Sequence, residues 1–318
     1  MDKTGTELKP IKVGVLPLDG FALMAYSCTV EPFRASNVLS GRHLYDVLNL
    51  GWSLSPVSSS GAATVSPQFV IHDSPSLDYL FVVAGGNPLN FSDKGIFSWL
   101  GRISRFGTKL GGVSGGPVIL AKAGLMNGRR MTVHWEHAEA LSEIFPDLMI
   151  ERTLYVIDRD RFTCAGGTAA LDMMLELVTQ QNGNKFANLV SDWFLHTEIR
   201  PSVGPQRSGL AARVGSQNSL VLSAVRVMEN HIADPISLEE IASQIKITSR
   251  QLNRLFKQHL NHSTMRYYRD LRLEKAKNLL INSPLRLVEI ALATGFSNPS
   301  HFSRIFSEVF GRSPSNFR

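Results

Sequence analysis

The residues with the clearest chemical potential are a serine between glycines, in the run GVSGG at residues 112–116. This run matches the G-x-S-x-G pattern of a nucleophile elbow, in which the serine stands on a tight turn between a strand and a helix. An apolar run precedes Ser114 and the helical pattern PVILAKAGL follows it. The pattern is therefore compatible with a hydrolase in which Ser114 attacks a carbonyl group.

A serine nucleophile also needs a general base within hydrogen-bond reach and a third group that orients the base. His134, in RMTVHWEH, is the best-placed candidate base. The other candidates are His137 and His196 as bases, and Asp172 and Glu31 as orienting groups. None of them stands at a spacing specific to a triad, so we expect no catalysis and interpret Ser114, Glu31 and His134 as a vestigial site.

The same turn has an interpretation that needs no catalysis. Gly115 and Gly116 would leave backbone N–H groups exposed at a helix N-terminus, where an anion is favoured. We expect the carboxylate of a small effector there. The alternative is that the glycines only permit the tight turn.

The elements that position this serine follow an α/β pattern. Apolar runs at 11–17, 80–86, 109–116 and 161–167 are typical of buried strands, and helical patterns follow two of them. Alternation of this kind predicts a flavodoxin-like parallel sheet sandwiched by helices. Gly-rich turns at strand ends are where such sheets bind ligands.

Composition and charge divide the chain. Residues 219–318 carry fourteen Lys and Arg against eight Asp and Glu, so the whole net charge of +6 lies there. We predict a sensing domain at 1–200, a linker rich in Pro, Gly and Ser at 201–218, and an all-α domain at 219–318. The basic domain suggests a polyanion partner, although a merely soluble basic surface is the alternative.

We expect no signal peptide, and the sequence has no apolar run of the roughly 18 residues that span a bilayer. Apolar residues make up 43% of it, which is typical of a globular protein. Its two cysteines, Cys28 and Cys164, are not expected to form a disulfide. We expect a cytoplasmic protein with no membrane association, no metal and no cofactor.

The last hundred residues contain two helix pairs. The capping boxes Ser237-x-x-Glu240 and Thr248-x-x-Gln251 start the two helices of the first pair. In the second pair, Gly295 suits the turn and Asn298-Pro299 starts the next helix. Two short helices joined by a tight turn form a helix-turn-helix, and an amphipathic helix separates the two units. Two DNA-reading helices about 34 Å apart would enter successive major grooves. The alternative is that this region is a helical packing or dimerisation domain.

Residues 220–318 carry a set of specific motifs, namely Ile241-Ala242, Leu252-x-Arg254-x-Phe256, Arg272-Leu273-x-x-Ala276, Ile290-Ala291-x-x-x-Gly295-Phe296-Ser297, Phe302-x-Arg304-x-Phe306 and Gly311-x-Ser313-Pro314-x-x-x-Arg318. This domain resembles the AraC/XylS transcription factors. The resemblance implies base-reading side chains at Arg250, Asn253 and Arg254 in the first unit, and at Ser300, His301, Ser303 and Arg304 in the second. Arginine suits guanine and asparagine suits adenine. For Arg254 and Arg304, phosphate contact or an internal salt bridge is the alternative.

The first 180 residues carry Glu31 in TVEPFR, the Gly85-Gly86 pair, the elbow with its downstream Ala123-Gly124-Leu125, and Thr132-x-His134-Trp135. Residues 11–180 thereby resemble the DJ-1/PfpI group of the class I glutamine amidotransferase-like fold, in the version fused to AraC-type domains. Enzymes of that group place a cysteine at the elbow, where this chain has Ser114 and no thiolate chemistry. We expect the effector to contact Ser114, Gly115, Gly86, Trp135, His134 and Glu31.

A longer stretch, from AGLMNGRRMTVHWEH to DWFLHTEIRPSVGPQR, is similar to regulators of glycine betaine, carnitine and related quaternary-amine catabolism. Arginine-responsive relatives look alike, so arginine is the alternative effector. A trimethylammonium group favours aromatic faces within about 6 Å. The candidate aromatic residues are Tyr26, Trp52, Trp99, Trp135 and Trp193, each of which could instead be a core residue; Trp135 is the preferred one.

The sequence therefore predicts a transcriptional regulator rather than an enzyme. Its expected partners are double-stranded promoter DNA, a small-molecule effector, RNA polymerase and a second copy of itself. The resemblance implies activation. The alternatives are an amidase- or hydrolase-like enzyme that uses Ser114 and carries a DNA-binding appendage, and a constitutive architectural DNA binder that is indifferent to metabolites.

Overall fold

A computed structural model describes residues 9–317, which form two compact units that meet between Gln206 and Arg207. This division falls inside the predicted linker. The same segment contains a short helix, α7 (Leu210–Val214), which the sequence did not predict. Within the described residues, no helix is long and apolar enough to cross a membrane.

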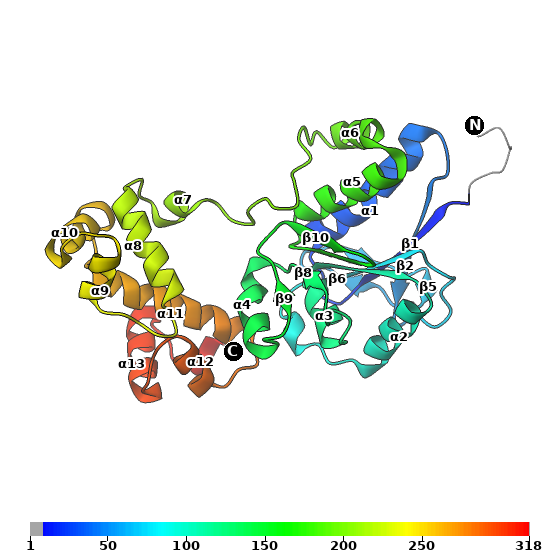
Figure 1. The fold of residues 1–318 in the computed structure, drawn as a ribbon. Helices are drawn as coiled ribbons and strands as arrows, with labels where there is room; N and C mark the ends of the chain where they lie inside the picture. The colour runs from blue at the N-terminus through cyan, green and yellow to red at the C-terminus, as the bar shows by residue number, and fades with distance from the viewer. Residues whose placement is uncertain (1–8, 318) are drawn as a thin grey trace. The chain divides into compact units, whose positions relative to one another are not determined.

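The first unit is built on a seven-stranded sheet in the order β10-β11-β7-β6-β1-β2-β5 (Figure 1). Neighbouring strands are parallel except for the antiparallel pair β10–β11 at one edge. The strands are β1 (Ile11–Pro17), β2 (Tyr45–Gly51), β5 (Phe69–Val70), β6 (Tyr79–Ala84), β7 (Lys109–Ser114), β10 (Tyr155–Asp158) and β11 (Arg161–Cys164). This confirms the predicted α/β class with a mainly parallel sheet.

Helices cover both faces of this sheet, as Figure 1 shows. On one face lie α1 (Leu23–Ser40), α5 (Ala169–Asn182) and α6 (Asn184–Trp193); on the other lie α2 (Lys94–Arg105) and α3 (Gly116–Lys122). The remaining elements are β3 (Val57–Ser58), β4 (Thr64–Val65), η1 (Pro88–Asn90), β8 (Arg130–Met131), α4 (Trp135–Ile144) and β9 (Met149–Ile150). Because both faces are covered, the central strands are apolar at nearly every position: β6 is buried along its whole length.

The register of the central strands determines which residues meet at the carboxyl edge of the sheet. Ala84 of β6 pairs with Ser114 of β7, and Val113 pairs with Cys164 of β11. The turns that follow these three strands therefore lie side by side. The predicted elbow is in this row.

The second unit is entirely helical, as the sequence predicted. Its elements are α7, α8 (Ser219–Asn230), α9 (Leu238–Gln244), α10 (Ser249–Leu260), α11 (Thr264–Asn282), α12 (Leu287–Ala293), α13 (Pro299–Phe310) and η2 (Pro314–Phe317). One cluster of its core joins α8, α9, α10 and α11 through residues such as Leu252, Phe256 and Tyr268, all at most 1% exposed. Phe302 and Phe306 of α13 are fully buried and their rings are in contact.

Candidate functional site

The first helix-turn-helix consists of α9 and α10. The Ser237 hydroxyl accepts the Glu240 N–H, and the Glu240 carboxylate accepts the Ser237 N–H at 2.7 Å. Thr248 and Gln251 form the same reciprocal pair at the start of α10. Both capping boxes predicted from the sequence are confirmed.

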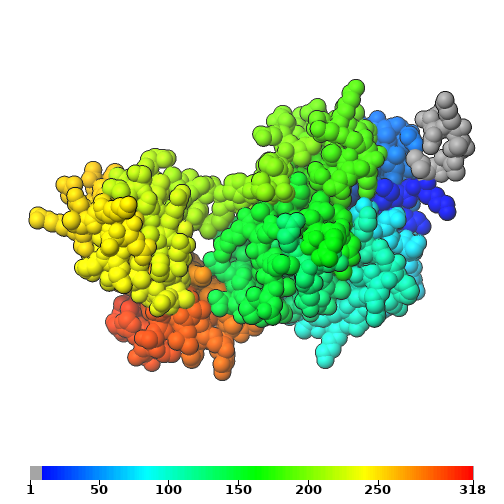
Figure 2. Space-filling model, in the orientation of Figure 1, coloured from blue at the N-terminus to red at the C-terminus, as the bar shows by residue number. Residues whose placement is uncertain are grey.

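The exposed face of α10 is strongly basic. Leu252 and Phe256 are buried, which leaves Arg250, Arg254 and Lys257 on the exposed side, and no residue of α10 is acidic. Figure 2 shows the atoms of this helix, in yellow to orange, at the surface of the unit. An exposed helix that carries only positive charge is suited to the phosphates and base edges of a major groove.

Asn253 also links this helix to the next one. Its side-chain oxygen accepts the backbone N–H of Thr264 at 3.1 Å, at the beginning of α11. This bond joins α10 to α11. A base-reading role for the Asn253 side-chain amide stays a prediction.

The second helix-turn-helix consists of α12 and α13. The Asn298 side chain accepts the N–H groups of Ser300 and His301 at 2.9 and 3.1 Å, which fixes the start of α13. Ser300, His301 and Arg304 are exposed, and Ser303 is half-buried. Arg304 forms an ion pair with Glu308 at 2.8 Å. Both side chains are more than half exposed, so this pair is worth little and Arg304 can exchange it for a DNA phosphate.

Arg272 connects α11 to the turn of this second unit. Its guanidinium donates to the carbonyl oxygens of Thr294 and Gly295 at 2.8 and 2.5 Å and lies 4.2 Å from the centre of the Phe296 ring. Gly295 has φ +75°, and an added Cβ would lie 2.6 Å from the carbonyl oxygen of Ile232. The central helix therefore holds the second recognition unit through a motif residue that contacts backbone.

The elbow of the first unit is tightly packed. Ser114 has φ +60° and is 9% exposed, and an added Cβ on Gly166 would lie 2.6 Å from the Cβ of Ser114. The N–H of Gly115 donates to the carbonyl oxygen of Ala84 at 3.0 Å. This corrects the expectation that the Gly115 amide is free for an anion. Gly86 has φ +57° and open space where a side chain would lie.

The other residues of the predicted site are engaged elsewhere. His134 begins α4, and its Nδ1 accepts the Glu136 N–H at 3.4 Å; burial lowers its pKa. The carboxylate of Glu31 pairs with Arg34 one turn further along α1, at 2.6 Å. The ring of Trp135 lies 5.3 Å from that of His134. Among the hydrogen bonds of the described residues, neither Glu31 nor His134 has Ser114 as a partner.

A thiol lies beside the elbow, which the sequence did not predict. Cys164 is fully buried, and the backbone N–H groups of Ser114 and Gly166 point to its sulfur. Burial raises the pKa of Cys164 to about 12 and also raises that of Cys28. Both thiols are therefore protonated at neutral pH, so the spatial proximity of Cys164 to Ser114 does not supply a nucleophilic thiolate.

A buried carboxylate anchors the segment that leaves the first unit. Asp172 is fully buried and accepts the Nε2–H of His196 at 2.9 Å, the backbone N–H of Arg200 at 2.9 Å and the Arg200 guanidinium at 2.6 Å. Asp172 thus orients His196 and not His134. Further along this segment, the side-chain N–H groups of Gln206 donate hydrogen bonds to the carbonyl oxygens of Val133 and Thr153. We call residues 194–206 the exit segment.

These features define a class of protein: a DNA-binding regulator whose double helix-turn-helix unit is joined to a mainly parallel α/β unit that carries Ser114 at its elbow. Residues 11–180 match the DJ-1/PfpI family, and residues 241–318 match a helix-turn-helix domain. The HTH-type transcriptional regulator GlxA of Rhizobium meliloti (strain 1021) is 39% identical over 96% of this chain and 95% of its own length. The HTH-type transcriptional regulator CdhR of Pseudomonas aeruginosa is 39% identical over 95% of this chain and 90% of its own length.

The chain therefore belongs to the HTH-type transcriptional regulators in which a DJ-1/PfpI domain precedes an AraC-type helix-turn-helix domain. Among solved structures, a THiJ/PfpI family protein from Pseudomonas syringae has a TM-score of 0.55 at 22% identity. That match covers 70% of this chain and 88% of the other chain, and it shows the fold.

Proposed function

We propose that this regulator changes its engagement of promoter DNA when the first unit binds a small amino-acid-like or quaternary-amine metabolite. The observation that carries the proposal is the pairing of two capped helix-turn-helix units, the first with a basic recognition helix, with an α/β unit of the kind that binds ligands at the carboxyl ends of its parallel strands. The effector would lie at that edge, near Ser114, Gly86 and Trp135. Arginine is the alternative effector.

At the DNA, we propose that α10 and α13 enter the major groove. The candidates for contact are exposed or half-buried side chains of these helices: Arg250, Asn253, Arg254, Ser300, His301, Ser303 and Arg304. We propose further that the protein works in the cytoplasm as a homodimer on repeated half-sites and activates transcription by recruiting RNA polymerase. An architectural binder would instead hold DNA equally well with and without metabolites.

The test is a binding titration of the full-length protein on labelled promoter DNA, repeated with glycine betaine, carnitine, dimethylglycine, choline and arginine. The effector should change DNA affinity. In the absence of DNA, at 100 times its dissociation constant, it should stabilise the first unit by about 2.7 kcal/mol. DNA binding that no compound alters, with no thermal stabilisation, would remove these effectors from the proposal and leave the DNA-binding function in place.

The competing proposal is an enzyme, because the elbow places a serine hydroxyl on a strained turn. We propose that this domain has no catalytic role, since the candidate base His134 and the candidate orienting group Glu31 are engaged with other residues. Ser114→Ala distinguishes the two proposals. An enzyme would lose turnover of ester or amide substrates, whereas a sensor would retain DNA binding and lose at most some effector affinity.

A further inference from the structure

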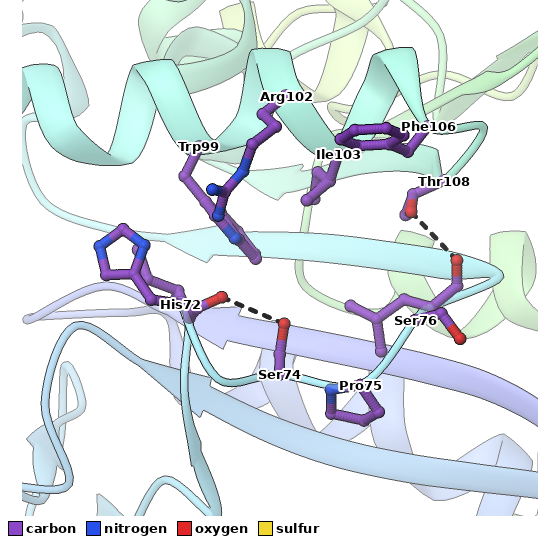
Figure 3. Close-up of a pocket in the computed structure, with 11 residues that line it drawn as sticks. His72, Ser74, Pro75, Ser76, Trp99, Arg102, Ile103, Phe106 and Thr108 are labelled. Atoms are coloured by element: carbon purple, nitrogen blue, oxygen red, sulfur yellow. Dashed lines mark hydrogen bonds between the residues drawn. The ribbon is translucent and has the colours of Figure 1, made fainter.

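A cavity of the first unit lies away from the elbow, at the other edge of the sheet. It has a volume of about 250 Å³ and opens between α2 and the segment 71–77 (Figure 3). Leu77 and Thr108, which line it, come directly before β6 and β7, so the cavity is at the amino ends of the parallel strands. The elbow follows the carboxyl ends of the same strands. The two places are therefore on opposite edges of one sheet.

The walls of this cavity are mainly apolar. Leu77 and Ile103 contribute aliphatic surface, while the buried residues Ile71 and Trp99, 1% and 3% exposed, lie beneath it. Phe106 lies at the rim with 84% of its surface exposed. A bound apolar group would cover part of this exposed ring.

One charge dominates the cavity. Figure 3 shows the side chain of Arg102 extending from α2 past Trp99 into the cavity. No residue that lines the cavity is acidic, and within the described part of the chain no ion pair involves Arg102. The imidazole of His72 also lies at the rim. Its ring meets that of Trp52 edge-on, with 5.4 Å between the ring centres.

Two hydroxyl groups in the cavity are already satisfied. Ser74 donates to the carbonyl oxygen of Ile71 at 3.1 Å, and Thr108 donates to that of Leu77 at 3.0 Å. Ser76 and His72 also present polar atoms to the cavity, and Arg102 is the lining residue that carries a permanent positive charge. A guanidinium pairs best with a carboxylate, through two parallel hydrogen bonds, and stacks on planar groups.

We propose that this cavity binds a small carboxylate that carries a compact aromatic or branched apolar group. The carboxylate would pair with Arg102, and the apolar group would pack on Leu77, Ile103 and Phe106. The cavity is smaller than the roughly 300–1,000 Å³ of a pocket for a drug-sized molecule, so the ligand is a small metabolite. A quaternary ammonium without an acid group is excluded because Arg102 would repel it. This site does not depend on the effector proposed for the elbow.

The probe is benzoate, titrated calorimetrically into the full-length protein, with benzamide as its neutral isostere. We expect benzoate to bind and Arg102→Gln to weaken binding about tenfold or more, since a charge-assisted pair is lost. Arg105→Gln is the matched control, because it removes the same charge from an exposed position of α2 that does not line the cavity. Benzamide should bind weakly to all three proteins.

Equal benzoate affinity in wild type and Arg102→Gln would overturn the proposal, as would the absence of binding at millimolar benzoate. Loss of binding in Arg105→Gln as well would also count against it, because the effect would then follow net charge and not the cavity. Circular dichroism of both variants checks that the fold is kept. Arg102 is exposed and outside the core, so both variants should fold normally.

Discussion

Arg254 is the residue at which DNA recognition can be tested most directly. It is exposed on α10 between two buried core residues, Leu252 and Phe256, so its backbone position is fixed while its guanidinium is available. We expect Arg254→Ala to weaken binding to promoter DNA about tenfold, because one arginine contact contributes roughly 1–3 kcal/mol. Fluorescence anisotropy at several salt concentrations measures the loss.

Arg226→Ala is the control, since it removes the same charge from an exposed position on α8. A loss of affinity for promoter DNA, without a loss for DNA of unrelated sequence, indicates base reading by Arg254. A uniform loss with a salt slope smaller by about one indicates phosphate contact. Equal affinities of the two variants would contradict a position of α10 in the groove.

Residue types and short spacings predicted the caps and the exposed arginines, but not every partner. Asn253 is polar and on the recognition helix, yet its side-chain oxygen accepts a hydrogen bond from the backbone N–H of Thr264, eleven residues later in the chain. Cys164 comes fifty residues after Ser114 and reaches it only through the register of β7 with β11. Such pairings depend on how elements pack, and a single sequence carries no direct signal for them.

The turn of each helix-turn-helix unit contains one residue with a positive φ, and the residue type differs between the two turns. The first turn has Lys246 at φ +60°, and the second has Gly295 at φ +75° with the Ile232 carbonyl close by. We expect Gly295→Ala to destabilise the second unit by about 2 kcal/mol or more, from left-handed strain plus the steric contact. Calorimetric melting of the full chain measures this loss.

Lys246→Gly is the reciprocal variant. It relieves left-handed strain of about 1–2 kcal/mol but adds backbone entropy to the unfolded chain, so we expect a change of less than about 1 kcal/mol. If Gly295→Ala proved as mild as Lys246→Gly, the close approach of Ile232 would not be a constraint on the turn.

The exit segment is held to the first unit by a buried charge. Asp172 accepts hydrogen bonds from both His196 and Arg200, and its side chain is completely buried. We expect Asp172→Asn to destabilise this anchor by about 2–3 kcal/mol, because a buried ionic partner of Arg200 is lost while Arg200 can still reach water. Limited proteolysis within residues 194–206 should become faster, and any effect of an effector on DNA affinity should weaken.

Asp192→Asn serves as its control, since Asp192 is exposed on the adjacent helix α6. Unchanged proteolysis in Asp172→Asn would show that the segment is held by other contacts, such as those of Gln206. Faster proteolysis with a fully preserved effector response would show that the Asp172 anchor holds the exit segment but is not needed for the effector to change DNA affinity.

Elements with long apolar or strongly capped patterns were predictable, whereas short and half-buried ones were not. The fully buried run of β6 and the two capping boxes are plain in the sequence. By contrast, β2 mixes Asp46 and Asn49 with apolar residues and was missed, as was the five-residue α7. The cavity at Arg102 was also missed, because its lining comes from two separate segments of the chain, 71–77 and 99–108.

At the scale of the whole molecule, the two units have separate cores, so we expect them to respond differently to pH. His137 is 4% exposed in the first unit, and its Nδ1 has no hydrogen-bond partner within the described part of the chain. Burial, with a smaller contribution from His134, lowers the pKa of His137 to about 4.

The unfolded chain, with a histidine pKa of about 6.5, therefore binds a proton between pH 4 and 6.5 that the folded chain does not bind. The stability that this histidine supports is complete above pH 6.5 and is lost as the pH falls toward 4. The loss amounts to about 3 kcal/mol of the free energy of unfolding. Acid should consequently melt the first unit earlier, while this contribution is absent from the second.

Scanning calorimetry of the full chain between pH 4.5 and 7.5 tests this, with His137→Leu as the variant and His43→Gln as an exposed control. The apolar variant should be tolerated because the buried Nδ1 makes no hydrogen bond within the described residues. It should flatten the pH dependence of the first unit, and His43→Gln should leave that dependence unchanged. If His137→Leu kept the wild-type slope, groups other than His137 would be the source of the acid sensitivity of the first unit.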